Sequence, residues 1–212
     1  MMYKDTELLE KLSKVNWETA RRGYGNNHCG LIGLLNNWWI GLSDDHFTLS
    51  EIKTKSKKSC DSVLGIDKTA VGILEVEGWS PDEKPKKDGK LNWQRDLFKF
   101  DEFFKEDKRN LGSNLEFAIL LVYPTTNNLE DLVPPLETIK SKVMEYHCQK
   151  SIIIISLTYE NEKEILKKDE NNIRNWAKTD QFKSSLKEIE SVLVKNGEEK
   201  NRLSIKLSDS SD

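Results

Sequence analysis

Two stretches of this chain, residues 117–123 and residues 151–157, are continuously apolar. Runs of this length without polar alternation are typical of strands that are buried on both faces. Between them, Pro134-Pro135 fits the start of a helix, and residues 136–147 fit a helix that crosses over the sheet. A strand, a crossover helix and a second strand predict a parallel pair with a right-handed connection.

Helical spacing dominates several other regions. Residues 92–105 carry apolar side chains three or four positions apart, which predicts an amphipathic helix. The same reasoning predicts further helices, which cover residues 5–22, residues 31–42 and, as an amphipathic pair, residues 162–195. Residues 208–212 are expected to be a frayed tail.

A hairpin is expected in the middle of the chain. Two largely apolar segments, residues 60–66 and residues 70–78, flank the polar loop Asp67-Lys68-Thr69, and residues 46–53 predict a strand before them. The whole order predicts an α/β fold with a mixed central sheet of antiparallel hairpin strands and parallel strands, flanked by helices. We expect one domain over residues 1–199, made of N-terminal helices (1–45), a core (46–160) and C-terminal helices (161–199), and then a C-terminal tail (200–212).

Acidic side chains meet at one end of this hairpin if Ile66 faces Ala70. That register puts Asp61 across from Glu75, and strand alternation puts Glu77 on the face of Glu75. Carboxylates on opposed residues, with Cβ atoms about 4.5–5.5 Å apart, repel one another and raise their own pKa values unless a cation neutralises them. Mg²⁺ or Mn²⁺ is the expected occupant, because hard divalent ions prefer oxygen ligands. The alternative is an exposed hairpin face with ordinary surface acids, which the apolar surroundings disfavour.

Composition narrows the class of protein. The 212 residues, with a 33% charged fraction and a mean hydropathy of −0.66, describe a globular chain long enough for one core. No apolar run approaches the ~20 residues of a membrane span and the N-terminus lacks a signal peptide, so we expect an intracellular protein without membrane attachment. The histidines show no metal-ligand spacing and are expected to be structural. Cys29, Cys60 and Cys148 have no CxxC spacing, which argues against a zinc site or a disulfide framework.

The net charge of −3 argues against a protein that bulk charge alone holds on nucleic acid. Lysines nevertheless cluster on both sides of the acidic residues. Such clusters are either solvated loops or a grip on phosphates beside a metal site. They comprise Lys53, Lys55, Lys57 and Lys58 before Asp61, and Lys84, Lys86, Lys87 and Lys90 after Glu77.

The element order and these acids, over residues 46–125, resemble the PD-(D/E)XK nuclease superfamily. Its restriction-endonuclease-like core is a helix, three antiparallel strands, a helix and a further strand. That family carries an Asp on the second strand and an (E/D)-x-K motif on the third, matched here by Asp61 and by Glu75-Val76-Glu77. The segment Gln94-Arg95-Asp96-Leu97-Phe98 is similar to its QxxxY element, with Phe98 in place of Tyr. The chain is also similar to nuclease-like proteins of spindle-shaped archaeal viruses, which would make archaeal Holliday-junction resolvases the nearest functional relatives.

The resemblance implies a site that hydrolyses DNA phosphodiester bonds. Asp61 and Glu75 would bind Mg²⁺ or Mn²⁺. Glu77, which stands where the family has lysine, would orient or deprotonate the attacking water, or bind a second metal. Because that lysine is missing, no local cation is expected to offset the acids, and a metal becomes more necessary.

Residues outside the three acids complete the implied site. The family often adds a carboxylate from the first helix, assigned here to Glu18, with Glu7 or Glu10 as alternatives. Gln94 would orient a ligand or contact the DNA backbone, and Lys99 is a candidate phosphate contact.

The expected function is therefore a divalent-metal-dependent DNA endonuclease, selective for branched DNA as a Holliday-junction resolvase is, in DNA recombination, repair or replication. A resolvase cuts two strands related by two-fold symmetry, so a homodimer is expected. If the chain is viral, its intracellular location is the host cytoplasm. Two alternatives stay open: a catalytically inactive DNA-binding module with a nuclease fold, and a protein-interaction domain whose acidic face does not bind metal.

Overall fold

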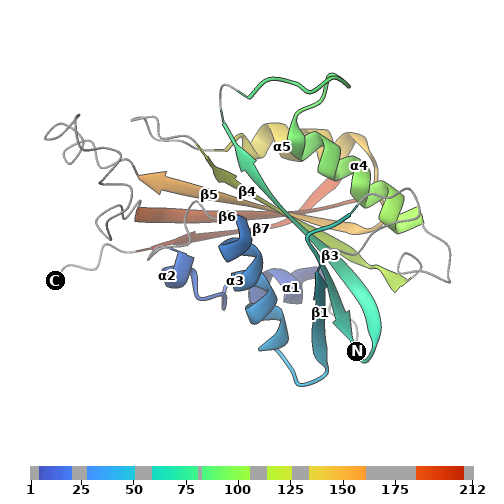
Figure 1. The fold of residues 1–212 in the computed structure, drawn as a ribbon, viewed down its shortest axis with the longest axis vertical. Helices are drawn as coiled ribbons and strands as arrows, with labels where there is room; N and C mark the ends of the chain where they lie inside the picture. Colours follow the sequence, from blue (N-terminus) through green and yellow to red (C-terminus); the bar gives the residue numbers. More distant parts are fainter. Residues whose placement is uncertain are drawn as a thin grey trace, which may run out of the picture.

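The computed structural model describes the chain in seven stretches, which are residues 5–20, 28–50, 59–80, 83–105, 114–125, 134–160 and 185–207. Within them, seven strands form one sheet whose spatial order follows the sequence. Helices lie on both faces of this sheet (Figure 1). The fold is α/β with a mixed central sheet, as the sequence predicts. None of the helices in these stretches is long and apolar enough to cross a membrane.

The elements are named in chain order. The helices are α1 (Asp5–Leu12), α2 (Trp17–Thr19), α3 (His28–Ile40), α4 (Asn92–Lys105) and α5 (Leu136–Glu145). The strands are β1 (His46–Ser50), β2 (Ser62–Ile66), β3 (Thr69–Trp79), β4 (Phe117–Pro124), β5 (Ser151–Glu160), β6 (Ser185–Lys195) and β7 (Glu198–Lys206).

β1, β2 and β3 form the antiparallel edge that the sequence predicts. Asp67 and Lys68 have positive φ angles of 48° and 67°, as a two-residue type I′ hairpin turn requires. The three-residue loop expected here is therefore wrong, because Ile66 pairs with Thr69 rather than with Ala70.

A β-bulge restores the predicted register at the far end of the hairpin. Leu64 pairs with Gly72 and Gly65 with Ala70, so Val71 of β3 is the extra residue, and beyond it Ser62 pairs with Leu74. The next residues outward on the two chain segments are Asp61 and Glu75. The turn and the bulge cancel each other, and the two acids come to the same end of the hairpin.

The parallel part of the sheet also agrees with the prediction. β3 pairs with β4 and β4 pairs with β5, both in parallel, and α5 lies in the crossover between β4 and β5. Glu75 lies opposite Leu120 and Glu77 opposite Val122, in the second half of β3. The acids therefore lie in the interior of the sheet, beside a fully buried strand.

The C-terminal third differs from the prediction. Helices expected over residues 161–199 and a tail expected over residues 200–212 are wrong where the structure describes them, since β6 and β7 form an antiparallel hairpin. A register shift between β5 and β6 puts Leu186 in the same core cluster as Ile189 and Leu193. That spacing of three and four residues imitates a helix. The rest of those ranges, residues 161–184 and 208–212, lies outside the described residues.

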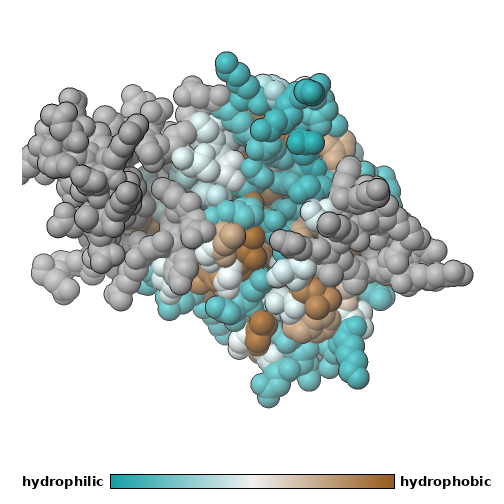
Figure 2. Space-filling model, viewed as in Figure 1, coloured by the Kyte–Doolittle hydropathy of each residue, from teal (hydrophilic) through white to brown (hydrophobic). Residues whose placement is uncertain are grey.

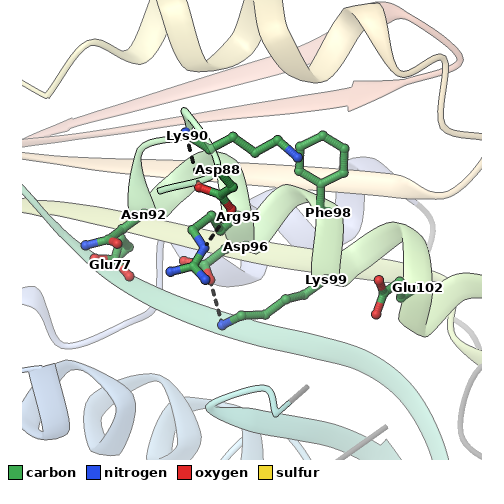
Figure 3. A pocket seen from close by; sticks show the side chains of 9 residues that line it. All are labelled: Glu77, Asp88, Lys90, Asn92, Arg95, Asp96, Phe98, Lys99 and Glu102. Carbon is green, nitrogen blue, oxygen red and sulfur yellow. Dashed lines mark hydrogen bonds and ion pairs between the residues drawn. The ribbon is translucent and has the colours of Figure 1, made fainter. Parts of the chain in front are cut away.

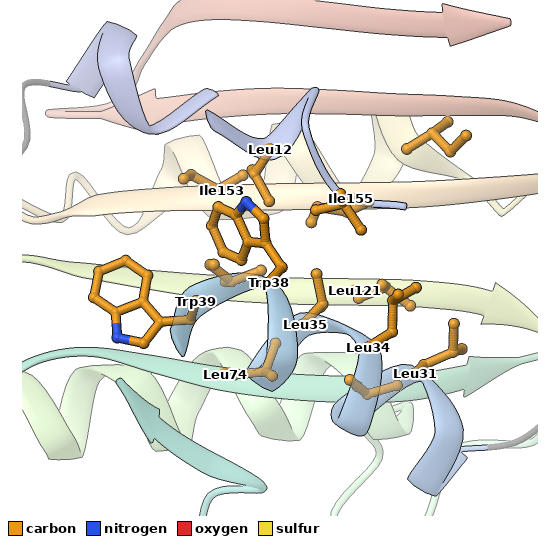
Figure 4. Packing of buried hydrophobic residues seen from close by; sticks show 14 of the residues in the cluster. Leu12, Leu31, Leu34, Leu35, Trp38, Trp39, Leu74, Leu121, Ile153 and Ile155 are labelled. Carbon is orange, nitrogen blue, oxygen red and sulfur yellow. The ribbon is translucent and has the colours of Figure 1, made fainter. Parts of the chain in front are cut away.

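α3 fills the middle of one face of the sheet (Figure 4). The single helix expected over residues 5–22 is divided where the structure describes it, because α1 ends at Leu12 and α2 is one short turn. α1 packs against β6 and β7, near the edge of the sheet that lies opposite the β1–β2 edge. The α3 contacts join Leu31, Leu34, Leu35, Trp38 and Trp39 to Leu74, Leu121, Ile153 and Ile155.

α4 and α5 bury the opposite face (Figure 1). Trp93 and Phe100 of α4 lie in one apolar cluster with Ile73 of β3. Glu75 and Glu77 follow Ile73 at intervals of two residues, so their side chains leave β3 on the same face. The two acids therefore lie on the α4 side of the sheet.

Candidate functional site

Glu75 is a buried carboxylate on an otherwise apolar strand. Its exposed fraction is 2%, and the neighbouring Leu74 and Val76 belong to the core on the other face. Placing a charge in such surroundings is unfavourable unless a partner neutralises it.

Lys99 of α4 provides that partner. Its Nζ lies 3.2 Å from Oε1 of Glu75 and 2.6 Å from Oδ1 of Asp96, a side chain that is itself buried (Figure 3). The expectation that no local cation offsets the acids is therefore wrong. Lys99, expected as a phosphate contact, has its ammonium group between two carboxylates.

Asp96 is the site residue that the sequence reasoning missed. A signal was present, because Asp96 and Lys99 lie three residues apart on the side of α4 that carries Trp93 and Phe100. Charged side chains on an apolar helix face are unfavourable unless they meet further charges on the element beneath. Here that element is β3, with Glu75.

The cluster carries more negative charge than Lys99 offsets. Burial, and then the charge of Asp96, raises the pKa of Glu75 to about 9, while Lys99 opposes the shift. Burial and Asp96 also raise the pKa of Glu77 to about 8. Burial raises the pKa of Asp96 itself. Acids in this condition bind a proton, or another cation, near neutral pH.

Asp61 joins the cluster from the start of β2. Its Oδ2 accepts a hydrogen bond of 2.8 Å from the backbone N–H of Val76, and its Oδ1 lies 3.5 Å from Nε2 of His28. Its negative charge contributes to the raised pKa of Glu75. His28, the first residue of α3, therefore lies at the site, although the sequence favours a structural role for it.

The donor atoms of this cluster are carboxylate oxygens, the kind of ligand that hard divalent ions prefer. Oδ2 of Asp96 is buried and has no hydrogen-bond partner among the described residues, and Glu77 can donate to Asp96 only when it is protonated. Carboxylate oxygens are the ligands that Mg²⁺ and Mn²⁺ prefer. In the described part of the chain, however, no three His, Cys, Asp or Glu side chains are arranged to hold a metal together. Lys99 is the cation present among these oxygens.

Two surface cavities meet at Glu77. One has a volume of about 640 Å³ and follows α4. The other has a volume of about 500 Å³ and lies at the ends of β3 and β4, with polar side chains from His28, Tyr123 and Thr125 among its lining. A chain-like ligand crossing the end of the sheet would therefore pass the Glu77 carboxylate.

The cavity along α4 is lined by side chains of both charges, with Asp88 and Glu102 among the acids (Figure 3). Lys90, Arg95 and Lys99 line it. The Lys90 ammonium lies 3.5 Å from the centre of the Phe98 ring, and Nε of Arg95 lies 3.3 Å from Oδ2 of Asp88. The cavity thus combines cations with the acidic cluster at its end.

Gln94 has a structural contact. Its Oε1 accepts a hydrogen bond of 2.9 Å from the backbone N–H of Leu91, the residue before α4. A glutamine at the third helical position that reaches back in this way satisfies a backbone donor at the start of the helix. Glu83 acts similarly by accepting from the N–H of Asn92 at 3.0 Å.

The acids expected from the first helix do not line the two cavities that Glu77 borders. Glu18 lies half-buried on α2 and lines neither of the cavities that Glu77 borders. Glu7 and Glu10 are exposed on α1, which packs against β6 and β7. The structure therefore brings Asp61, Glu75 and Glu77 to one end of the sheet, and adds Asp96 and Lys99 to them.

Comparison of the chain with protein-family models, curated proteins and solved structures gives no match in any of the three. The functional argument therefore rests on the residues of the site.

Proposed function

We propose that this chain is a divalent-metal-dependent DNA endonuclease that acts at the cluster of Asp61, Glu75, Glu77 and Asp96. The observation that carries the proposal is the burial of Glu75 and Asp96 beside a surface cavity that Lys90 and Arg95 also line. Apolar residues would pack this part of β3 and α4 without the cost of buried charge, so a strongly perturbed acid pair favours a functional site.

The strand arrangement supports the proposal. Three antiparallel strands, then α4, then a strand parallel to the third are the core that the nuclease resemblance leads one to expect. Glu75 and Glu77 lie on β3, as the family motif leads one to expect, and Asp61 directly precedes β2 rather than lying on it.

Asp61 and Glu75 would hold Mg²⁺ or Mn²⁺, with Asp96 as a further oxygen donor. When bound, such an ion polarises a phosphoryl oxygen and lowers the pKa of a water molecule. The N–H of Val76 orients the Asp61 carboxylate toward β3. Glu77, which borders both cavities, would accept the proton of the attacking water.

DNA is the proposed substrate because basic side chains lie next to the acids. Lys90 and Arg95 line the larger cavity, and exposed Lys84, Lys86 and Lys87 precede it in the chain. Figure 2 shows hydrophilic residues gathered over the α4 side of the molecule. Cations of this kind bind phosphates and position a duplex without reading its bases, which favours selection by DNA shape. A branched substrate cut on two strands requires two such sites, so a homodimer belongs to the proposal.

The test compares the wild-type protein with Glu75→Gln on a four-way junction, a linear duplex and single-stranded DNA, each with Mg²⁺, Mn²⁺ or EDTA. Glu75→Gln keeps the side-chain volume and removes the charge. Asp101→Asn is the matched control, because Asp101 is an acid of α4 that pairs with Lys105 outside the cavity. We expect the wild type and Asp101→Asn to cut the junction with metal, and Glu75→Gln not to cut it. Cleavage that survives Glu75→Gln would point to a contaminant.

A second candidate is an inactive DNA-binding module, and one observation favours it. Lys99 already neutralises Glu75, so the cluster is not left without a cation. Tight DNA binding without cleavage under every condition would select this candidate. If the protein binds neither Mn²⁺ nor DNA, the acidic face is better explained as a protein-interaction surface.

A further inference from the structure

We infer that Lys99 is a resident counter-ion that competes with a divalent cation for the oxygens of Glu75 and Asp96, and that Asp96 is a ligand of that cation. This inference rests on the proposed function only in that the cluster binds a divalent ion. It adds a competitor and a ligand that the sequence motif does not contain.

The contacts of Lys99 are those of a cation in a shared site. Its Nζ takes one oxygen of each carboxylate, Oε1 of Glu75 and Oδ1 of Asp96. The second oxygen of Asp96 is buried, and among the described residues only a protonated Glu77 carboxyl can donate a hydrogen bond to Asp96. The ammonium therefore satisfies the cluster only in part, and an oxygen ligand remains for another cation.

The charge of the cluster points the same way. One lysine contacts both Glu75 and Asp96, and the charge of Asp61 acts on Glu75 as well. Two buried carboxylates in contact with one ammonium group leave positive charge in deficit. A divalent ion brings twice the charge of an ammonium group, but it cannot share the same oxygens with the ammonium because like charges repel.

Lys99 has room to leave. Its side chain is 26% exposed, whereas those of Glu75 and Asp96 are 3% and 4% exposed. Lys99 also lines the cavity of about 640 Å³ beside the cluster. The flexible lysine stem can therefore carry the ammonium into this space, while the two carboxylates stay on β3 and α4.

The test is a calorimetric titration of the full chain with Mn²⁺, together with the shift of the thermal unfolding midpoint that Mn²⁺ causes. The variants are Lys99→Met, which removes the competitor, and Asp96→Asn, which removes the ligand. Lys105→Met is the matched control, since Lys105 is on the same helix and pairs only with the exposed Asp101 among the contacts seen.

We expect Lys99→Met to bind Mn²⁺ about tenfold more tightly than the wild type, or better, because the competing charge is gone. Lys105→Met should bind as the wild type does. Asp96→Asn should bind about tenfold more weakly, or worse, because a charged ligand is lost. Wild-type affinity in Lys99→Met, or in Asp96→Asn, would overturn the inference. If Lys99→Met does not fold because Glu75 and Asp96 lose their counter-charge, the Mn²⁺ affinity of Asp96→Asn decides whether the inference stands.

The outcomes separate this inference from the proposed function. Equal Mn²⁺ affinity of the wild type and Lys99→Met would reject the competition by Lys99, but it would remain compatible with a metal-dependent nuclease. Binding by Lys99→Met alone supports the competition and removes metal dependence from the native chain. No binding by any variant removes both.

Discussion

The Asp61 carboxylate accepts a hydrogen bond of 2.8 Å from the backbone N–H of Val76, the residue between Glu75 and Glu77. Its other oxygen lies 3.5 Å from Nε2 of His28. One side chain therefore ties the start of β2 to β3 and to the first residue of α3. Asp61 has both a structural contact and a proposed role with metal, and two substitutions can separate them.

Asp61→Ala removes the acceptor and leaves the Val76 N–H without it, so we expect the free energy of unfolding to fall by about 1–3 kcal/mol. Asp61→Asn keeps an acceptor oxygen and should stay closer to wild-type stability, yet lose Mn²⁺ affinity with the charge. Urea unfolding and calorimetric titration measure the two effects. Mn²⁺ affinity unchanged in Asp61→Asn would remove Asp61 from the proposed metal ligands.

The stability of the metal-free protein should depend on the ionisation of Glu75. Burial, and then the charge of Asp96, raises its pKa in the folded state to about 9 from an ordinary value of 4.5. Between these values the folded state binds more protons than the unfolded state, so the contribution is fully present below pH 4.5 and is lost as the pH rises toward 9. Thermal unfolding in EDTA from pH 5 to 9 should therefore show a falling midpoint.

Glu75→Gln should reduce this pH dependence, because the amide does not titrate, while Glu77, whose pKa is also raised, keeps part of it. Asp101 is an acid of α4 that pairs with Lys105 at the surface. The control Asp101→Asn should therefore keep the wild-type slope. A stability that rises between pH 5 and 9 in EDTA would contradict the assignment of a buried, proton-binding cluster.

Gly72 is a position where the sheet has no room for a side chain. A Cβ there would come 2.3 Å from Cζ of Phe117 on the neighbouring strand. We expect Gly72→Ala to lower the free energy of unfolding by roughly 1–3 kcal/mol, because the ring has to move within a packed core. Gly33→Ala is the control: a Cβ on this α3 residue meets nothing within 4 Å, and alanine favours a helix by up to about 1 kcal/mol. Denaturant unfolding measures both.

Lys90 and Arg95 are the proposed phosphate contacts in the cavity along α4. Replacing either with Gln should weaken binding to junction and linear DNA by similar factors, and lower the slope of log affinity against log salt by about 1. Lys105→Gln is the control on the same helix. Fluorescence anisotropy over a series of salt concentrations measures the slope. An effect confined to one DNA sequence would contradict contacts of this type.

Much of the fold follows from local patterns. β4 and β5 are recognisable because both of their faces are buried, which leaves no polar position to break the run. α4 is recognisable from its apolar spacing. The apolar spacing of β6 predicts a helix, because the bulge of this strand moves Leu186 onto the face of Ile189. A bulge depends on pairing with another strand, so the chain segment alone does not reveal it.

The site was predictable only in part, for a similar reason. The positions of Glu75 and Glu77 follow from strand alternation, which is a local property. The contact between Lys99 and Glu75 joins residues 24 positions apart in the chain. It depends on how α4 is rotated over the sheet, and no spacing within either element specifies that rotation.

The last strand, β7, has a consequence for assembly. It forms one edge of the sheet, and its exposed positions include the charged Glu198, Lys200 and Arg202. A guanidinium nitrogen of Arg202 also lies 2.6 Å from Oε1 of Glu137 on α5, so an ion pair links this edge strand to the helical layer. Ionic groups along a border strand discourage the addition of a foreign strand. In the homodimer proposed above, we therefore expect the partner to bind at another surface, because a continuous sheet running from one copy into the next is disfavoured at β7.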